Sequence, residues 1–93
     1  MTSVDDLKRK KVVASNASIL GDMEGAEVDL KTWQVTHLHV GLTKESTEKL
    51  AFKKPALGHV VVLLPVSVVK AIGDIISLDK SMTELKSVVE IKK

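Results

Sequence analysis

Hydrophobic and polar residues alternate along two neighbouring stretches of the chain. In residues 26–30 the even-numbered side chains are apolar and the odd-numbered ones are acidic. In residues 34–42 the even-numbered side chains share one face, and Val35, His37 and His39 lie on the other. Because a period of two residues is typical of a half-buried strand, these runs predict a β-hairpin closed by the short connection between them.

The stretch from His59 to Leu64 differs, because it is apolar on both faces of the predicted strand. Val60, Val62 and Leu64 would point to one side, and Val61 and Leu63 to the other. A strand with this pattern should be buried on both faces. The first face can meet the core of the domain, and we expect the second face, with Val61 and Leu63, to meet a second copy of the chain. The alternative is that the C-terminal helix covers this face within one chain.

A helix is predicted near the C-terminus. Ser81 and Glu84 have the spacing of a capping box, in which the Ser81 hydroxyl accepts from the Glu84 N–H and the Glu84 carboxylate accepts from the Ser81 N–H. Apolar residues then recur at helical spacing up to Val89, which predicts a helix over residues 82–90.

Shorter elements complete the predicted fold. Strands are expected over residues 10–14 and 75–78, whereas residues 43–50 could form one helical turn or a loop. No strand–helix–strand repeat is present, so the pattern predicts an all-β barrel of five to six short antiparallel strands with a helical lid. Residues 1–9 are polar and predict a flexible segment, which leaves residues 10–93 as a single domain.

Composition narrows how such a domain can be stabilised. The chain has 93 residues, no cysteine, one Trp, one Phe and no Tyr. Disulfides and thiolate metal sites are therefore excluded, and oligomerisation is the remaining common way to stabilise so small a core. The N-terminal residues lack the apolar stretch of a signal peptide, and no run reaches the ~20 apolar residues of a membrane helix. We expect a cytoplasmic protein that does not insert into the membrane directly.

Charge gives little reason to expect a nucleic-acid partner. The net charge is only +2, and the local excess of cations lies in Lys8-Arg9-Lys10-Lys11. This segment could be a solvated entry to the first strand or could contact phosphates. Aromatic stacking platforms for single strands are almost absent, so we expect nucleic-acid binding to be unlikely.

Residues that could carry chemistry are few. His37 and His39 share a face and could begin a metal site, but a third ligand would be needed, and the simpler interpretation is an outward or contact surface without metal. No serine lies in a Gly-x-Ser-x-Gly turn, and no glycine-rich phosphate-binding loop is present. We therefore expect no enzyme activity, no catalytic residue, no cofactor and no metal.

Trp33 is the most informative single residue. It lies in the predicted hairpin turn, where Gly, Asn or Asp would be usual. A large indole at a turn either folds back onto its own strands or is offered to a partner, and Trp is enriched in binding hot spots. Candidate contacts with a partner or a second copy are therefore Trp33, His37, His39, Val61 and Leu63.

Four segments together resemble the PRC-barrel signature. They are Ala26-Glu27-Val28-Asp29-Leu30, Trp33-Gln34-Val35-Thr36-His37-Leu38, Leu64-Pro65-Val66-Ser67 and Ala71-Ile72-Gly73-Asp74. The resemblance extends from about Lys10 to Leu78, and the hairpin and tail look most like the stand-alone archaeal branch of the family.

The resemblance implies a binding role and no catalytic residue. Stand-alone archaeal PRC-barrels are similar to dimeric adaptors that act in cell division with SepF and FtsZ, which implies a homodimer recruited to the membrane or division site through a partner. Another branch forms the C-terminal half of the ribosome-maturation factor RimM, so a ribosome- or RNA-associated role is the alternative. We expect neither the transmembrane helix of the reaction-centre branch nor the N-terminal domain of RimM in this protein.

Overall fold

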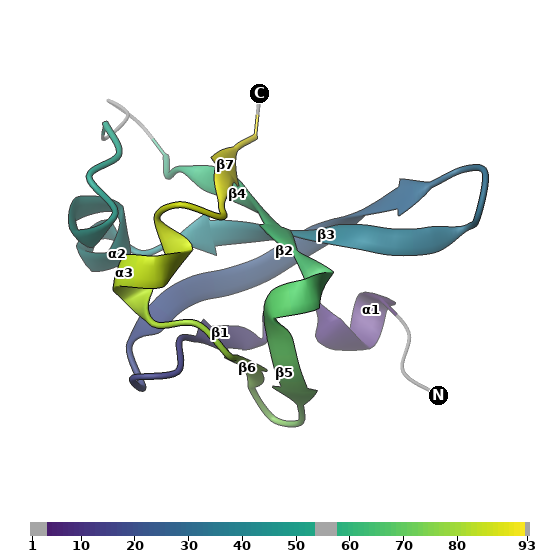
Figure 1. Ribbon diagram of the computed structural model, residues 1–93, viewed down its shortest axis with the longest axis horizontal. Coiled ribbons are helices and arrows are strands. Elements are labelled where there is room, and N and C mark those ends of the chain that lie inside the picture. Colours follow the sequence, from purple (N-terminus) through teal and green to yellow (C-terminus); the bar gives the residue numbers. More distant parts are fainter. Residues whose placement is uncertain (1–3, 54–57, 93) are drawn as a thin grey trace.

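The computed structural model describes residues 4–53 and 58–92, which form one β-sheet with short helices packed against it (Figure 1). The strands are β1 (Lys11–Val13), β2 (Ile19–Asp29), β3 (Gln34–Leu42), β4 (Val61–Pro65), β5 (Val69–Ile72), β6 (Ile76–Leu78) and β7 (Glu90–Ile91). The helices are α1 (Val4–Leu7), α2 (Lys44–Lys49), the 3-10 turn η1 (Val66–Val68) and α3 (Met82–Leu85).

The sheet is mixed and open. Its strand order is β5-β6-β1-β2-β3-β4-β7, so β5 and β7 form its two edges. Most neighbours are antiparallel, but β1 and β6 are parallel. The β-rich class is confirmed, whereas the expected closed barrel of five to six antiparallel strands is wrong for the part of the chain that the structure describes. The side-chain pattern shows which face a strand buries and does not show which strand lies beside it.

The predicted hairpin is confirmed as β2 and β3, which pair from Gly21 opposite Leu42 to Asp29 opposite Gln34. The register shifts between Met23 and Gly25 and again between Glu27 and Val28. At the second shift Thr36 is the extra residue on β3, which makes it a β-bulge.

This bulge changes the face that Val35 occupies. Strict alternation puts Val35 with His37 and His39, but the structure places it beside Leu38 in one groove. The expected position of Val35 is therefore wrong, because one extra residue in a strand moves each side chain beyond it to the opposite face of the sheet.

Strand β4 buries one face completely. Val62 and Leu64 are inaccessible to solvent and Val60 nearly so, which confirms that this face meets the core. Val61 and Leu63 on the other face are half-buried rather than fully buried within the described chain. The strand ends at Pro65, as a residue without an N–H should end it. Its outer edge pairs with β7, so the chain's own tail flanks this strand along its edge.

The capping box at Ser81 is confirmed in both halves. The Glu84 N–H donates to Ser81 Oγ over 3.3 Å, and the Ser81 N–H donates to Glu84 Oε1 over 2.9 Å. The bond from the Ser81 backbone, followed by that from its side chain, lowers the pKa of Glu84 below 4.5. The ionised Glu84 carboxylate therefore stabilises the folded state above about pH 4.5. This stabilisation is lost as the pH falls through the lowered pKa of Glu84 in the folded protein.

Helix α3 is shorter than expected. It ends at Leu85, and the residues to Ile91 turn and then form β7, so the expected helix over residues 82–90 is wrong beyond its first turn. The apolar residues at helical spacing are nevertheless used, because Leu85 and Val89 are both buried in the core. The apolar residues at helical spacing are therefore buried even though the helix does not continue beyond Leu85.

Two short helices, α1 and α2, contact β2. The sequence left residues 43–50 open between helix and loop, and in the structure Lys44–Lys49 form α2. Thr43 caps this helix, since its Oγ1 accepts a hydrogen bond from the Ser46 N–H. The buried Ser46 hydroxyl donates to the Leu20 carbonyl and so ties α2 to β2. Residues 4–7 form α1, and Leu7 packs against the core, so this part of the expected flexible segment is ordered; residues 1–3 lie outside the described residues.

Replacement of Ser81 tests the contribution of the capping box. Ser81→Ala removes the acceptor for the Glu84 N–H, and loss of an N-cap of this kind costs about 1 kcal/mol of stability. Urea denaturation at pH 7 should show the decrease in the free energy of unfolding, and Thr83→Ala on the exposed side of α3 should change it much less. Equal stability of both variants would contradict a role for the cap.

Candidate interaction surface

The end of the β2–β3 hairpin projects from the rest of the sheet (Figure 1). Pairing of β1 with β2 reaches only to Asp22, and pairing of β4 with β3 covers only residues 37–41. Residues 28–36 therefore form a two-stranded ribbon with no strand beside either outer edge among the described residues. A two-stranded ribbon is marginally stable alone in water, so contacts along this one would be favourable.

The tip of the ribbon is apolar and uncovered. Trp33 is 76% exposed and Leu30 is 73% exposed, while Val28 and Val35 behind them are 40% and 36% exposed. The indole is therefore not folded back onto its own strands, so the self-packed position is wrong, and contact with a partner stays a prediction.

Local hydrogen bonds hold the tip in one conformation. The Trp33 N–H donates to the Asp29 carbonyl over 2.6 Å, and Asp29 Oδ1 accepts from the Lys31 N–H over 2.8 Å. Trp33 adopts a φ of 58°, in the left-handed region that costs a side chain of this size free energy. A residue with a strained backbone and an exposed side chain is a candidate for function rather than for stability.

An apolar groove lies at the base of the hairpin. It has a volume of about 350 Å³ and is lined by side chains from α1, β3, η1 and β5: Leu7, Val35, Leu38, Val66, Val69 and Ile72. Its rim is exposed, since Ile72 is 50% and Val66 is 36% accessible to solvent. Among the residues that the structure describes, no polar side chain lines it, so it suits an apolar side chain better than a polar ligand.

The opposite face of the hairpin is polar. His39 Nε2 lies 2.7 Å from Glu27 Oε1, His37 Nδ1 lies 3.0 Å from Thr36 Oγ1, and His59 pairs with a different carboxylate. Within residues 4–53 and 58–92, no three His, Cys, Asp or Glu side chains are grouped so that they could hold a metal ion. His37 and His39 thus lie on one face but have separate partners.

The His59 pair depends on a glycine in the neighbouring strand. His59 Nε2 lies 2.5 Å from Glu24 Oε2, and a Cβ at Gly41 would collide with that carboxylate. The bare backbone of Gly41 therefore leaves the space in which Glu24 and His59 meet, over the middle of β3.

The predicted contact residues fall into two groups. In register, His37 is opposite Pro65, His39 is opposite Leu63, and Gly41 is opposite Val61. Cross-strand partners share a face, so His39 lies with Leu63 on the polar side of the sheet. Trp33 is separate from them, at the far end of the hairpin.

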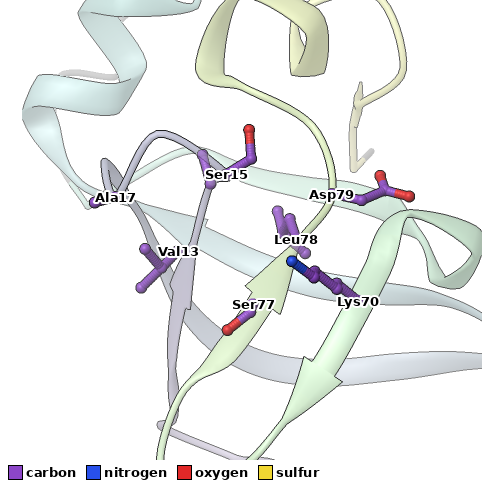
Figure 2. A pocket seen from close by; sticks show the side chains of 8 residues that line it. Val13, Ser15, Ala17, Lys70, Ser77, Leu78 and Asp79 are labelled. Carbon is purple, nitrogen blue, oxygen red and sulfur yellow. The ribbon is translucent and has the colours of Figure 1, made fainter.

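A larger cavity of about 450 Å³ lies elsewhere, between β1, β5 and β6 (Figure 2). Val13 and Leu78 line it together with Lys70, Ser15 and Ser77. No histidine lines it, and the Asp79 carboxylate points away from Ser77 in Figure 2.

The basic segment is partly engaged within the chain. Lys10 Nζ donates to the Gly73 carbonyl over 2.6 Å, and Lys11 Nζ lies 2.9 Å from Asp22 Oδ1. Two of the four cations in Lys8-Arg9-Lys10-Lys11 thus have partners in the fold, which leaves fewer for phosphates.

No protein-family model and no curated protein matches the chain. Among the described residues, no helix is long and apolar enough to cross a membrane. The exposed apolar residues of the hairpin are therefore the feature that indicates a function.

Several residues of this surface were not singled out from the sequence. Leu7, Val66 and Ile72 come from three elements and meet only in the folded chain. Leu30 did have a signal, because it is a large apolar residue three positions before Trp33, at the same turn.

Proposed function

We propose that this protein is a non-catalytic interaction module that binds protein partners through the projecting end of the β2–β3 hairpin. The observation that carries this proposal is the exposure of Leu30 and Trp33 at the tip of an otherwise unsupported ribbon. Exposed tryptophan supplies a large contact area at low entropic cost, and such residues dominate the binding energy of many interfaces.

The resemblance to stand-alone archaeal PRC-barrels supplies the class of partner. On this proposal the protein is a homodimeric adaptor in cell division that acts with SepF and FtsZ and reaches the membrane or division site through them. Two hairpins in one dimer would present two binding elements, and the second contact would form at a high effective concentration.

Binding of purified SepF and of purified FtsZ to the wild-type protein and to Trp33→Ala tests the proposal. Removal of a hot-spot tryptophan costs about 2 kcal/mol or more, so the dissociation constant should rise about 30-fold. Calorimetric titration measures it directly. Lys31→Ala, an exposed neighbour at the same tip, should change the constant by less than about threefold.

Two outcomes would reject different parts of this proposal. If the wild-type protein binds neither SepF nor FtsZ, the division-adaptor assignment is wrong. If a partner binds Trp33→Ala and wild type equally well, the tip of the hairpin is not the binding element.

A further inference from the structure

We infer that the cavity between β1, β5 and β6 binds a small organic monocarboxylate that carries an apolar group. The cavity has a volume of about 450 Å³, within the range of roughly 300–1,000 Å³ that is usual for small-molecule sites. It shares no lining residue with the groove at the base of the hairpin. The inference therefore goes beyond the proposed binding of protein partners and does not depend on it.

The cavity lies where two parallel strands end. β1 and β6 run in the same direction, with Val13 opposite Ser77, so their carboxyl ends meet at one end of the sheet. Residues that follow the two strands, among them Ala14 and Asp79, continue its wall, and Lys70 on β5 contributes a third side. The fold thus brings together three segments that are distant in the sequence.

Backbone hydrogen bonds fix these walls. The Ser15 N–H donates to the Lys80 carbonyl over 2.8 Å, which joins the segment after β1 to the segment after β6. The Ala14 N–H donates to the Ser18 carbonyl over 2.8 Å, and the Ala17 N–H donates to the Ala14 carbonyl over 3.0 Å. Because the walls are already held in place, a ligand would lose little free energy in ordering them.

A β-bulge on β5 places a lysine at the cavity. Val69 pairs with Leu78 and Ala71 pairs with Ser77, so Lys70 is the extra residue between them. In Figure 2 its side chain extends from β5 toward β6. Lys70 Nζ has no hydrogen bond or ion pair with another residue in 4–53 or 58–92, so this cation is available to a ligand.

The other lining residues suit a carboxylate with an apolar end. Ser15 and Ser77 each have a hydroxyl that can donate a hydrogen bond, and neither hydroxyl has a partner in the part of the chain that the structure describes. Val13 and Leu78 supply apolar contacts, and Leu78 is only 1% exposed, so it lies at the bottom of the cavity. An ammonium group and hydroxyls recognise an anion, whereas these apolar side chains favour a hydrocarbon group.

The charge of the cavity favours a monoanion over a phosphate. Lys70 is the one cation among the described residues that line it, and the acidic Asp79 lines it as well. The Asp79 carboxylate points away in Figure 2, but its repulsion of an anion grows with the charge of that anion. A phosphate monoester carries nearly two negative charges at neutral pH, so a carboxylate with a single charge matches one lysine better.

Titration with hexanoate, followed through the NMR signals of the backbone amides, tests this site. The amide signals of Ser15 and Ser77 should shift, with a dissociation constant of about 1 mM for so small a ligand. Lys70→Gln should raise this constant about fivefold, because it removes the cation that pairs with the carboxylate. Lys31→Gln removes the same charge at the exposed hairpin tip and is the matched control, for which the constant should change by less than about twofold.

Three further measurements examine the charge of the ligand. Asp79→Asn removes a repulsion and should lower the dissociation constant of hexanoate about twofold. Hexylamine has the same hydrocarbon chain with the opposite charge and should leave the amide signals of Ser15 and Ser77 unchanged. Tighter binding of hexyl phosphate than of hexanoate would refute the choice of a monocarboxylate. Unshifted signals with hexanoate, or equal affinity of Lys70→Gln and wild type, would overturn the site itself.

Discussion

Gly21→Ala is expected to destabilise the fold severely, by about 3–5 kcal/mol. A Cβ at this position would collide with the Gly41 carbonyl oxygen and would lie 2.8 Å from the Gly41 carbonyl carbon and 3.0 Å from Leu42 Cα. All three contacts are with backbone atoms of the neighbouring strand, which cannot rotate away. Relief would require β2 and β3 to separate where they are both buried.

Thermal and urea denaturation of Gly21→Ala beside Gly73→Ala would measure this cost. Gly73 has no atom within 4 Å of its would-be Cβ, so its replacement should change the free energy of unfolding by less than about 0.5 kcal/mol. If Gly21→Ala folds with the stability of Gly73→Ala, the close approach of β2 and β3 at this point is not real.

The hairpin could be predicted because its signal is local. Alternation in residues 26–30 and 34–42 reports which side chains meet the core, and a short connection leaves antiparallel pairing as the natural result. The capping box is local in the same way, since Ser81 and Glu84 satisfy each other within one turn. Features of this kind need no knowledge of the remaining chain.

Strand order and closure could not be predicted by the same reasoning. The parallel contact of β1 with β6 joins Val12 to Ile76, more than sixty residues away. β7 contains only Glu90 and Ile91, which is too short for any period to be visible. Edges and directions of a sheet are set by the packing of all strands together, and the pattern of one strand does not contain them.

The candidate site was predictable only at its most unusual residue. Trp33 was identifiable because an indole is uncommon at a turn and aromatic residues are scarce in this chain. Val35 was assigned to the wrong face because a bulge leaves no clear mark in the sequence. The groove escaped prediction because Leu7, Val66 and Ile72 look like ordinary core residues until the fold brings them together at the surface.

The same substitution at two leucines should separate stability from binding. Leu64 is fully buried in the middle of β4, whereas Leu30 at the hairpin tip is 73% exposed. Leu64→Ala removes apolar contacts and leaves a cavity, so it should lower the free energy of unfolding by about 3 kcal/mol, within the 2–5 kcal/mol typical of buried leucines. Leu30→Ala should lower it by less than about 0.5 kcal/mol in the monomer, because little packing is lost.

The order of the two variants should reverse when association is measured. Leu30→Ala removes contact area from the hairpin tip and should weaken binding of SepF or FtsZ about tenfold, whereas Leu64→Ala that remains folded should bind as the wild type does. Unfolding must be followed at protein concentrations below the dimer dissociation constant, since association stabilises the folded state by mass action. A loss of stability in Leu30→Ala under those conditions, with partner binding unchanged, would show that the tip serves the fold. The opposite result would show that the chain keeps an apolar tip uncovered because a protein partner binds it.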